Sequence, residues 1–167
     1  HPNRAVPVKP WLLIDVDGVL NPVMSGAAAK RGGFVTRHAY GPAGWRYKVH
    51  LSPEHGRWLV AMADVCDLAW ATTWEHTADR EFGPVLRMPP LPVVTFDFAR
   101  APGSKVPGIL RFTAARPFIW IDDDVTDLDR DLLADSGTHH LVLEPDPHVG
   151  LTRAHLDQAR AWTADLT

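Results

Sequence analysis

Residues 11–20, WLLIDVDGVL, decide the fold of this chain. Four large apolar residues lead into two carboxylates, Asp15 and Asp17, and a glycine follows. A short apolar run that ends at a turn signal is typical of a strand buried on both faces of a parallel sheet. Asp15 would then stand at the carboxyl end of the strand, the edge where open α/β sheets bind ligands. An ordinary strand that ends in an Asp-Gly turn is the alternative, because such turns are common.

The composition is that of a globular protein with a sizeable core. The chain contains 167 residues, of which 46% are hydrophobic and 22% charged, and we expect a single domain over residues 1–167. No apolar run approaches the roughly 20 residues that a membrane-spanning helix needs. Cys66 is the only cysteine, which excludes an intrachain disulfide and a thiolate metal cluster and fits a reducing compartment. We therefore expect a cytoplasmic protein with no membrane partner.

Charge is unevenly placed along the chain. The net charge of −3 gives the molecule as a whole no attraction to nucleic acid. Residues 122–135, however, contain seven aspartates and one arginine. Residues 21–50 contain no acid and five basic residues, namely Lys30, Arg31, Arg37, Arg46 and Lys48. This basic segment can steer an anionic substrate, although charges on an exposed hairpin are more often simply solvated.

Strands alternate with helices along the sequence. Apolar runs predict strands at 11–16, 65–71, 91–96, 118–121 and 139–143. Helices are predicted from Ser52, over 75–86, from Ser104, after residue 124 and from Thr152. A Gly- and Ala-rich segment at 21–33 is expected to be a flexible loop, and two β-rich runs around a Gly/Pro turn predict a hairpin at 34–51. We expect a Rossmann-like α/β three-layer sandwich with a mainly parallel five-stranded sheet and a hairpin flap after its first strand.

Polar side chains follow several of the predicted strands and would meet at one edge of the sheet. A carboxylate there can act as a nucleophile, and a second acid can carry a proton to and from the reacting oxygen. A hydroxyl and an ammonium group can hold phosphate oxygens, and further acids can complete a Mg²⁺ site. The residues concerned are Asp15, Asp17, Thr72, Thr73, Lys105, Asp122 and Asp123.

The chain resembles the haloacid dehalogenase (HAD) superfamily of phosphohydrolases. Four motifs stand in the order of that family: Asp-Val-Asp-Gly-Val-Leu at 15–20, Ala-Thr-Thr-Trp at 71–74, Gly-Ser-Lys at 103–105 and Ile-Asp-Asp-Asp at 121–124. The resemblance implies that Asp15 is a nucleophile forming an aspartyl-phosphate and a Mg²⁺ ligand. It implies that Asp17 is the general acid/base and binds Mg²⁺ through its backbone carbonyl. It also implies that Thr72 and Lys105 hold the phosphate and that Asp122 binds the metal.

A narrower likeness is to the capless HAD domains associated with Swiss-army-knife RNA repair proteins. Trp-Ala-Thr-Thr-Trp at 70–74 and Pro-Asp-Pro-His-Val-Gly-Leu-Thr at 145–152 carry it. This likeness implies a phosphorylated nucleotide or nucleic-acid end as substrate and an RNA repair protein as a candidate partner. No segment is long enough for a separate cap domain, so the hairpin at 34–51 would be the only cover. Such a site can admit a bulky substrate or be closed by a partner.

The sequence leaves several assignments open. The direct metal ligand is Asp122 or Asp123, and the phosphate-holding threonine is Thr72 or Thr73. Asp127, five residues past Asp122, has a spacing that the family also uses to orient lysine or metal. Four further side chains are candidates for facing the substrate, although exposed or packing roles are simpler: Arg37, Arg46, Trp74 and His76.

These patterns favour a Mg²⁺-dependent phosphomonoesterase, with nucleotide or nucleic-acid-end phosphates among its candidate substrates. The alternative is a weakly active or inactive module that binds phosphorylated nucleic-acid ends or an RNA repair partner. Substrate identity and oligomeric state do not follow from the sequence, because one fold and one catalytic set serve many substrates.

Overall fold

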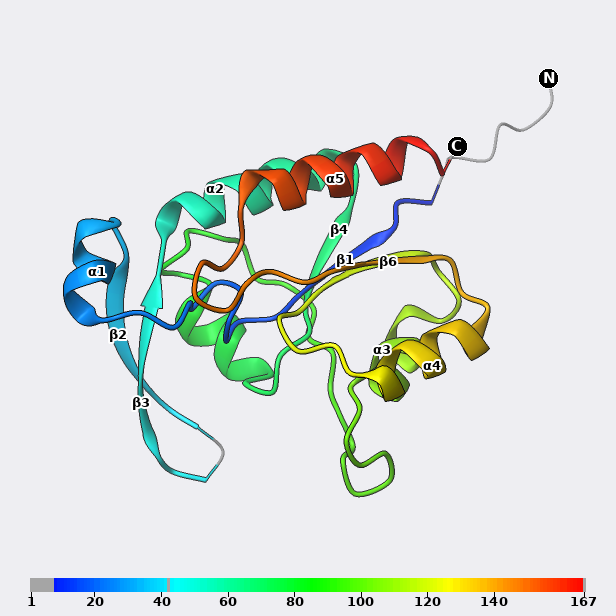
Figure 1. The fold of residues 1–167 in the computed structure, drawn as a ribbon, viewed down its shortest axis with the longest axis horizontal. Helices are drawn as coiled ribbons and strands as arrows, with labels where there is room; N and C mark the ends of the chain where they lie inside the picture. Colours follow the sequence, from blue (N-terminus) through cyan, green and yellow to red (C-terminus); the bar gives the residue numbers. More distant parts are fainter. Residues whose placement is uncertain (1–7, 42, 167) are drawn as a thin grey trace.

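A parallel four-stranded sheet forms the centre of the computed structural model, which describes residues 8–41 and 43–166 (Figure 1). The strands are β1 (Trp11–Ile14), β4 (Asp67–Trp70), β5 (Phe118–Ile121) and β6 (His140–Leu143). Their order in the sheet is β4-β1-β5-β6. The register aligns Ile14 with Trp70 on one side and with Ile121 on the other, so β1, β4 and β5 end level with one another.

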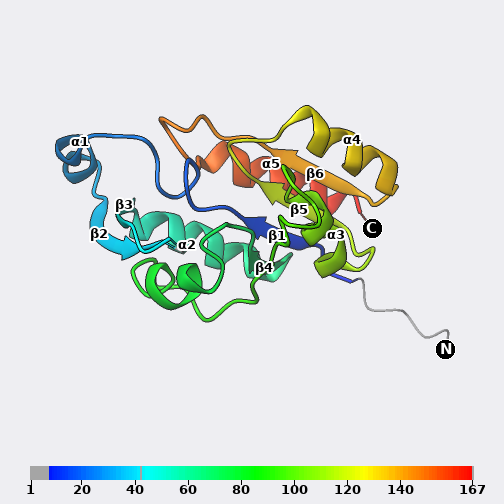
Figure 2. The same ribbon diagram turned by 90° about the horizontal axis from the view of Figure 1, so that it is seen from below.

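Helices cover both faces of this sheet, which gives three layers (Figures 1 and 2). Helices α2 (Pro53–Ala61) and α5 (Arg153–Ala164) lie side by side on one face. Helices α3 (Val106–Thr113) and α4 (Asp127–Ser136) pack together on the other. Two short elements, η1 (Met62–Asp64) and the π-helical turn η2 (Ala78–Phe82), connect the larger ones. Among the described residues, no helix has the length and apolar character needed to cross a membrane.

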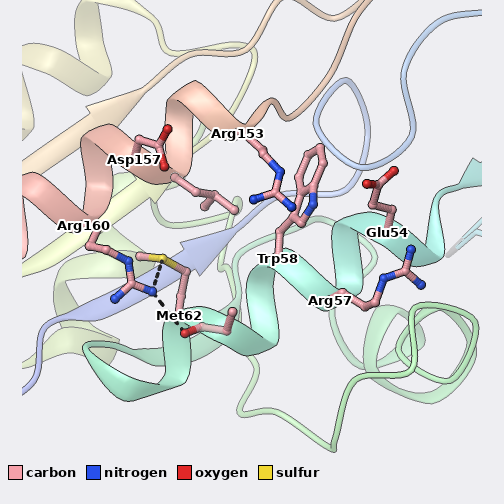
Figure 3. Close-up of a pocket in the computed structure, with 9 residues that line it drawn as sticks. Glu54, Arg57, Trp58, Met62, Arg153, Asp157 and Arg160 are labelled. Atoms are coloured by element: carbon pink, nitrogen blue, oxygen red, sulfur yellow. Dashed lines mark hydrogen bonds between the residues drawn. The ribbon is translucent and has the colours of Figure 1, made fainter.

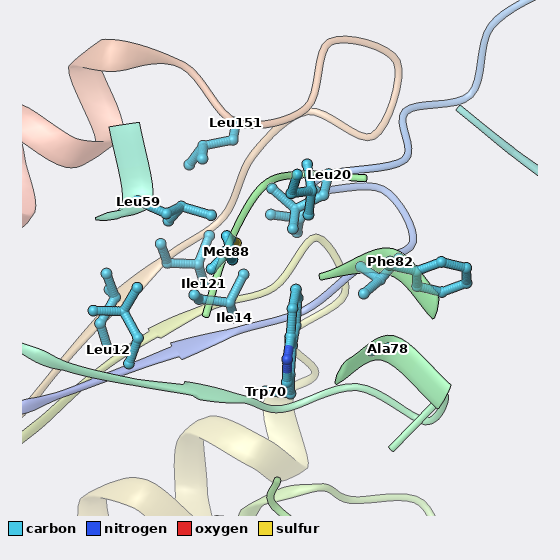
Figure 4. Close-up of a cluster of buried hydrophobic side chains, with 14 of the residues drawn as sticks. Leu12, Ile14, Leu20, Leu59, Trp70, Ala78, Phe82, Met88, Ile121 and Leu151 are labelled. Carbon is cyan, nitrogen blue, oxygen red and sulfur yellow. The ribbon is translucent and has the colours of Figure 1, made fainter. Parts of the chain in front are cut away.

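Side chains alternate along the strands, so the hydrophobic core consists of two clusters, one on each face of the sheet. Figure 4 shows the cluster that contains Leu12 and Ile14. Leu12 and Ile14 point to the side of α2 and α5, whereas Leu13 joins a second cluster on the side of α3 and α4. All three are fully buried. A strand that is covered by helices on both faces needs apolar residues at successive positions, which explains the unbroken hydrophobic run Trp11–Ile14. The first cluster also takes in Leu59, Trp70, Phe82, Met88, Ile121 and Leu151.

The predicted hairpin is confirmed as β2 (Val35–Tyr40) paired antiparallel with β3 (Arg46–Leu51). The prediction of a loop over 21–33 is wrong, because the helix α1 (Gly26–Arg31) lies within it. Ser25 begins this helix, and its hydroxyl accepts a hydrogen bond from the Ala28 N–H at 3.1 Å. The small residues that suggested flexibility are mostly alanines, which favour helix once a capping residue is present.

The predicted strand at 91–96 does not form, so the sheet has four strands rather than five. A single bridge joins Val93 to Trp70. The Val94 N–H donates to the Trp70 carbonyl, but Pro92 has no N–H to extend a ladder. The Phe96 N–H donates to the Glu75 carboxylate instead of to a strand. The proline-rich segment therefore runs along the edge of β4 without becoming a strand.

The predicted helix over 75–86 is confirmed in part, because residues 76–82 are helical and include the η2 turn. Glu75 has a φ of 48°, which keeps it out of the helix. Gly83 and Pro84 then end it in a series of turns. The helices predicted after Ser52, Ser104, residue 124 and Thr152 are all present as α2, α3, α4 and α5.

Helix α2 packs so closely on residues 83–88 that Gly56 has no room for a side chain. A methyl group at Gly56 would lie 1.8 Å from the Leu86 carbonyl oxygen. We expect Gly56→Ala to lower the free energy of unfolding by about 1–3 kcal/mol, the usual cost of overpacking. The matched control is Gly26→Ala, where nothing lies within 4 Å of the added carbon. Denaturant midpoints of the two variants at an unchanged m-value test this, and equal stabilities would contradict the close packing.

Candidate active site

The carboxyl ends of β1, β4 and β5 bring their following residues together. The Asp15 N–H donates to the Ile121 carbonyl at 3.1 Å, and the Ala71 N–H donates to the Ile14 carbonyl at 2.8 Å. These bonds carry the register of the sheet one residue past the strands. A cavity of about 330 Å³ opens at this edge, where open α/β sheets bind ligands. Its lining includes Asp15, Asp17, Thr73, Lys105, Asp122 and Asp123.

Lys105 is the one basic residue among the described residues that line this cavity. Its Nζ lies 2.7 Å from Asp122 Oδ2 and 3.3 Å from Asp15 Oδ1, and it donates to the Ala71 carbonyl at 3.4 Å. Burial by itself would lower the pKa of Lys105, but the two carboxylates outweigh it and raise that pKa. Lys105 is therefore charged at neutral pH and held where a phosphate oxygen could contact it.

Asp15 is 5% exposed and has one carboxylate oxygen committed to the protein. Its Oδ1 accepts a hydrogen bond from the Val16 N–H at 2.8 Å and is also the oxygen nearest Lys105. Burial raises the pKa of the Asp15 carboxyl well above its usual range, Lys105 opposes this rise, and Asp122 adds to it. A further positive charge in the cavity would favour the ionised form.

Three carboxylates form a candidate metal site. One oxygen from each of Asp15, Asp122 and Asp123 can be chosen so that all lie within 4.8 Å of one another. Three carboxylates against the single charge of Lys105 leave an excess of negative charge, and carboxylate oxygens are the ligands that Mg²⁺ prefers. The residues present thus fit a hard divalent cation. Asp127, by contrast, is exposed and begins α4 outside this group.

Gly18 makes room for one of these ligands. Its φ is 77°, and a Cβ built on it would lie 2.2 Å from Asp123 Oδ2. Asp122 is held differently, because its Oδ1 accepts from the Asp124 N–H while its Oδ2 contacts Lys105. Both candidates for the direct ligand therefore belong to the cluster, with Asp122 fixed by the protein and Asp123 packed over the glycine.

Asp17 stands apart from the metal cluster and is held there by two side chains. Its Oδ2 accepts a hydrogen bond from Trp74 Nε1 at 2.9 Å, and its Oδ1 accepts one from Asn21 Nδ2 at 2.9 Å. The Asn21 side chain in turn accepts from the His50 N–H, at the end of β3. The orientation of Asp17 is thus tied to the hairpin, and its carboxylate lines the same cavity as Asp15.

The two threonines have different surroundings. Thr72 is buried, and its hydroxyl oxygen accepts from the Trp74 N–H at 3.2 Å, which supports the turn after β4. Thr73 is exposed and is the one that lines the cavity. The Thr73 hydroxyl can therefore donate a hydrogen bond to a phosphate in the cavity. The Thr72 hydroxyl only accepts a bond here, so its own proton is still available for donation to a phosphate.

The structure does not bring every candidate residue to the cavity. Arg37, Arg46 and His76 are exposed and lie outside the set of described residues that line it. Trp74 is 8% exposed, so it neither stacks freely on a substrate nor merely fills space beneath the site. Its contact is the hydrogen bond to Asp17.

Sequence reasoning missed two supporting residues. Asn21 gave no signal, because its role depends on the position of β3. Asp129 is buried, lines the cavity and accepts hydrogen bonds from the Ser104 hydroxyl and the Thr126 N–H. The Thr126-x-x-Asp129 spacing of a capping box could have revealed the second bond. Asp129 thereby fixes Ser104, which directly precedes Lys105.

Fold and site together define a Rossmann-like α/β protein with an acidic centre and one lysine at the carboxyl edge of its sheet. Residues 11–156 match the family model described as the HAD domain in Swiss Army Knife RNA repair proteins. The chain belongs to this family. No curated protein matches it.

We expect Mg²⁺ to stabilise the protein through the carboxylate cluster. Binding to the folded state alone raises the melting temperature, by about 2–4 °C per kcal/mol in a chain of this size. Asp123→Asn should lose most of that increase, because it removes a ligand without touching Lys105. The control is Asp131→Asn, which removes an exposed acid of α4. Thermal unfolding with and without Mg²⁺ measures this, and an equal shift in the two variants would contradict the site.

Proposed function

We propose that this protein is a Mg²⁺-dependent phosphomonoesterase that works through an aspartyl-phosphate on Asp15. The observation that carries the proposal is the division of labour among the acids. Asp15 lies with Lys105 and the metal-type cluster, whereas Asp17 is held away from that cluster by Trp74 and Asn21. A nucleophile and a separate proton carrier are what a two-step phosphoryl transfer needs.

In the first step an Asp15 carboxylate oxygen attacks phosphorus, and the bond from phosphorus to the leaving oxygen breaks. The committed position of Oδ1 leaves Oδ2 as the attacking atom. Asp17 gives its proton to the leaving oxygen, so an alcohol departs. Lys105 offsets the negative charge of the phosphoryl oxygens, and the hydroxyl of Thr72 or Thr73 donates to one of them.

In the second step Asp17, now ionised, takes a proton from water while the water oxygen attacks phosphorus. The acyl phosphate bond breaks, which regenerates the Asp15 carboxylate and releases inorganic phosphate. The Trp74 and Asn21 donors fix the orientation of the Asp17 side chain at the cavity. The same residue therefore serves as acid and then as base.

Asp15, Asp122 and Asp123 would hold the Mg²⁺, together with the Asp17 backbone carbonyl that the family resemblance implies. When bound, the ion supplies charge neutralisation for the phosphate and for the Asp15 carboxylate. The protein contributes the rigid placement of its ligands, which follows from strand ends and from the Gly18 turn.

The substrate we propose is a phosphorylated nucleotide or nucleic-acid end, and the description of the family as a domain of RNA repair proteins supports this. An RNA repair partner is part of the same proposal. The proposal also includes the organisation of residues 1–167 as one domain, in which the hairpin is the only cover of the active site. A purely binding module is a weaker alternative, because binding an end needs no proton carrier such as the oriented Asp17.

Asp15→Asn should abolish release of phosphate from a small phosphomonoester while leaving the melting temperature nearly unchanged, because the amide keeps the shape of the carboxylate. Asp17→Asn should slow turnover by about 10²–10⁴-fold, the usual contribution of a positioned acid or base. It should also let phosphorylated protein accumulate, which acid-quench trapping would detect. Retained turnover in the Asp15 variant would sink the covalent mechanism, and no slowing in the Asp17 variant would sink its role.

Trp74→Phe should lower kcat about tenfold or more, because it deletes a hydrogen bond to a charged group, worth about 1.5–3 kcal/mol. The ring that packs against Phe82 is retained. The matched control is Trp70→Phe, which deletes an indole hydrogen bond to the Asp79 carboxylate outside the cavity. The control should lower stability but not the kcat of folded protein. Equal kcat losses in both variants would show that Trp74 acts only through folding.

A further inference from the structure

The hairpin exposes large aromatic side chains that the core does not use. Tyr40, Trp45 and Tyr47 are 66%, 67% and 48% exposed. The hairpin is anchored instead by the buried residues Val49 and Leu51. The pairing register places Tyr47 on the same face as Ala39 and Val49, and Tyr40 on the opposite face beside Arg46, so each face of the hairpin presents an exposed aromatic side chain.

A second small cavity lies between Tyr47 of the hairpin and the catalytic cavity. It has a volume of about 150 Å³ and shares Asp17 and Thr73 with the cavity around Asp15. Its other lining residues are Gly41, Tyr47 and Trp74. The Tyr47 and Trp74 rings meet edge to face, with centroids 5.5 Å apart. A Cβ on Gly41 would lie 2.8 Å from Tyr47 Cε2, so glycine lets the tyrosine ring lie across the strand.

The small cavity lies beside Asp17, and this position indicates which part of a substrate it would hold. Asp17 is the proposed donor to the leaving oxygen, so the group attached to that oxygen lies on this side of the phosphate. Ligand cavities usually have about 300–1,000 Å³, and this one is smaller, which suits a single ring system. The half-exposed Tyr47 ring favours a flat ring that can stack on it, while the buried Trp74 ring forms the inner wall.

The other face of the hairpin is basic. Alternation places His38, Arg46 and Lys48 on the face opposite the buried Ala39 and Val49, with His38 paired to Lys48. Within the part of the chain that the structure describes, no ion pair involves Arg37, Arg46 or Lys48. These cations are therefore available to phosphates that follow the terminal nucleotide.

We propose that the cavity formed by Gly41, Tyr47, Thr73 and Trp74 is a leaving-group subsite for the terminal nucleoside of a single-stranded nucleic acid, and that Arg46 and Lys48 bind its next phosphates. This rests on the proposed phosphomonoesterase function. Aromatic stacking beside a basic strand is the arrangement that single-strand binding uses.

Another cavity, lined by three arginines and two acids, provides a comparison (Figure 3). It lies between α2 and α5 and has a volume of about 290 Å³. Arg153 stacks on the Trp58 ring, and Arg160 is paired with Asp64. This cavity shares no lining residue with the catalytic one, so a nucleic-acid end held there would not reach Asp15 by the same path. Removing charge from it is the matched control for removing charge from the hairpin.

The subsite is tested by the ratio of kcat/KM for a phosphorylated single-stranded oligonucleotide to kcat/KM for glycerol phosphate, whose leaving group cannot stack. Oligonucleotides with the phosphate at the 5′ or the 3′ end form two arms. Tyr47→Leu should lower this ratio about tenfold for the preferred end, a change within the range of one base stack. Tyr47→Phe keeps the ring and should keep the ratio.

The charge contacts are tested by salt. KM for the oligonucleotide should rise with salt concentration, with a logarithmic slope of about 0.7 per phosphate contacted. The double variant Arg46→Gln, Lys48→Gln should reduce that slope by about 1.4, whereas the double variant Arg57→Gln, Arg153→Gln should leave it unchanged. Equal slopes in both double variants would overturn the role of the hairpin.

Failure of the subsite and failure of the proposed function give different results. Turnover of glycerol phosphate by the wild type with an unchanged ratio in Tyr47→Leu would overturn the subsite alone. No turnover of any phosphomonoester would overturn the proposed function. Oligonucleotide binding by fluorescence anisotropy then decides the subsite, because Tyr47→Leu should still bind about tenfold more weakly than wild type, and equal affinities would overturn it.

Discussion

Repulsion among three closely spaced carboxylates is the constraint on which this structure depends. Asp15, Asp122 and Asp123 bring ligand oxygens within 4.8 Å of one another, and a single lysine lies against two of them. The parallel register forces this proximity, because β1 and β5 end level and each is followed by an acid. The strong packing of the sheet core on both faces holds the acids in place despite the repulsion. A site of this kind is poised to bind a cation and an anion together.

The hairpin takes part in the site rather than merely covering it. One connection runs from the His50 N–H through Asn21 to Asp17, and a second runs from Tyr47 through Trp74 to the same carboxylate. A shift of β3 would move both donors. The proposed proton carrier, Asp17, is therefore linked to the element that would meet the leaving group, whereas the proposed nucleophile, Asp15, is anchored at the end of a sheet strand.

Errors in the predicted fold occurred where local composition and tertiary contacts disagreed. The segment 91–96 has apolar residues suited to a strand, but Pro92 cannot donate to the β4 edge, and the Phe96 N–H finds the Glu75 carboxylate. Residues 26–31 looked like a flexible loop, yet the Ser25 cap and three successive alanines make a helix. The sequence offers only stacking or packing as roles for Trp74. Its hydrogen bond to Asp17 joins positions 57 residues apart, and no local pattern predicts such a bond.

The sequence by itself determined the four strands of the sheet, the hairpin and the order of the acids and the lysine, because burial on two faces leaves unbroken apolar runs. It could not separate Asp122 from Asp123 or Thr72 from Thr73, since neighbours in sequence differ only in which way the backbone turns them. The tertiary structure decided which side chains orient Asp17, namely Asn21 and Trp74. That arrangement depends on contacts between distant segments, which form only when the sheet and the hairpin have packed together.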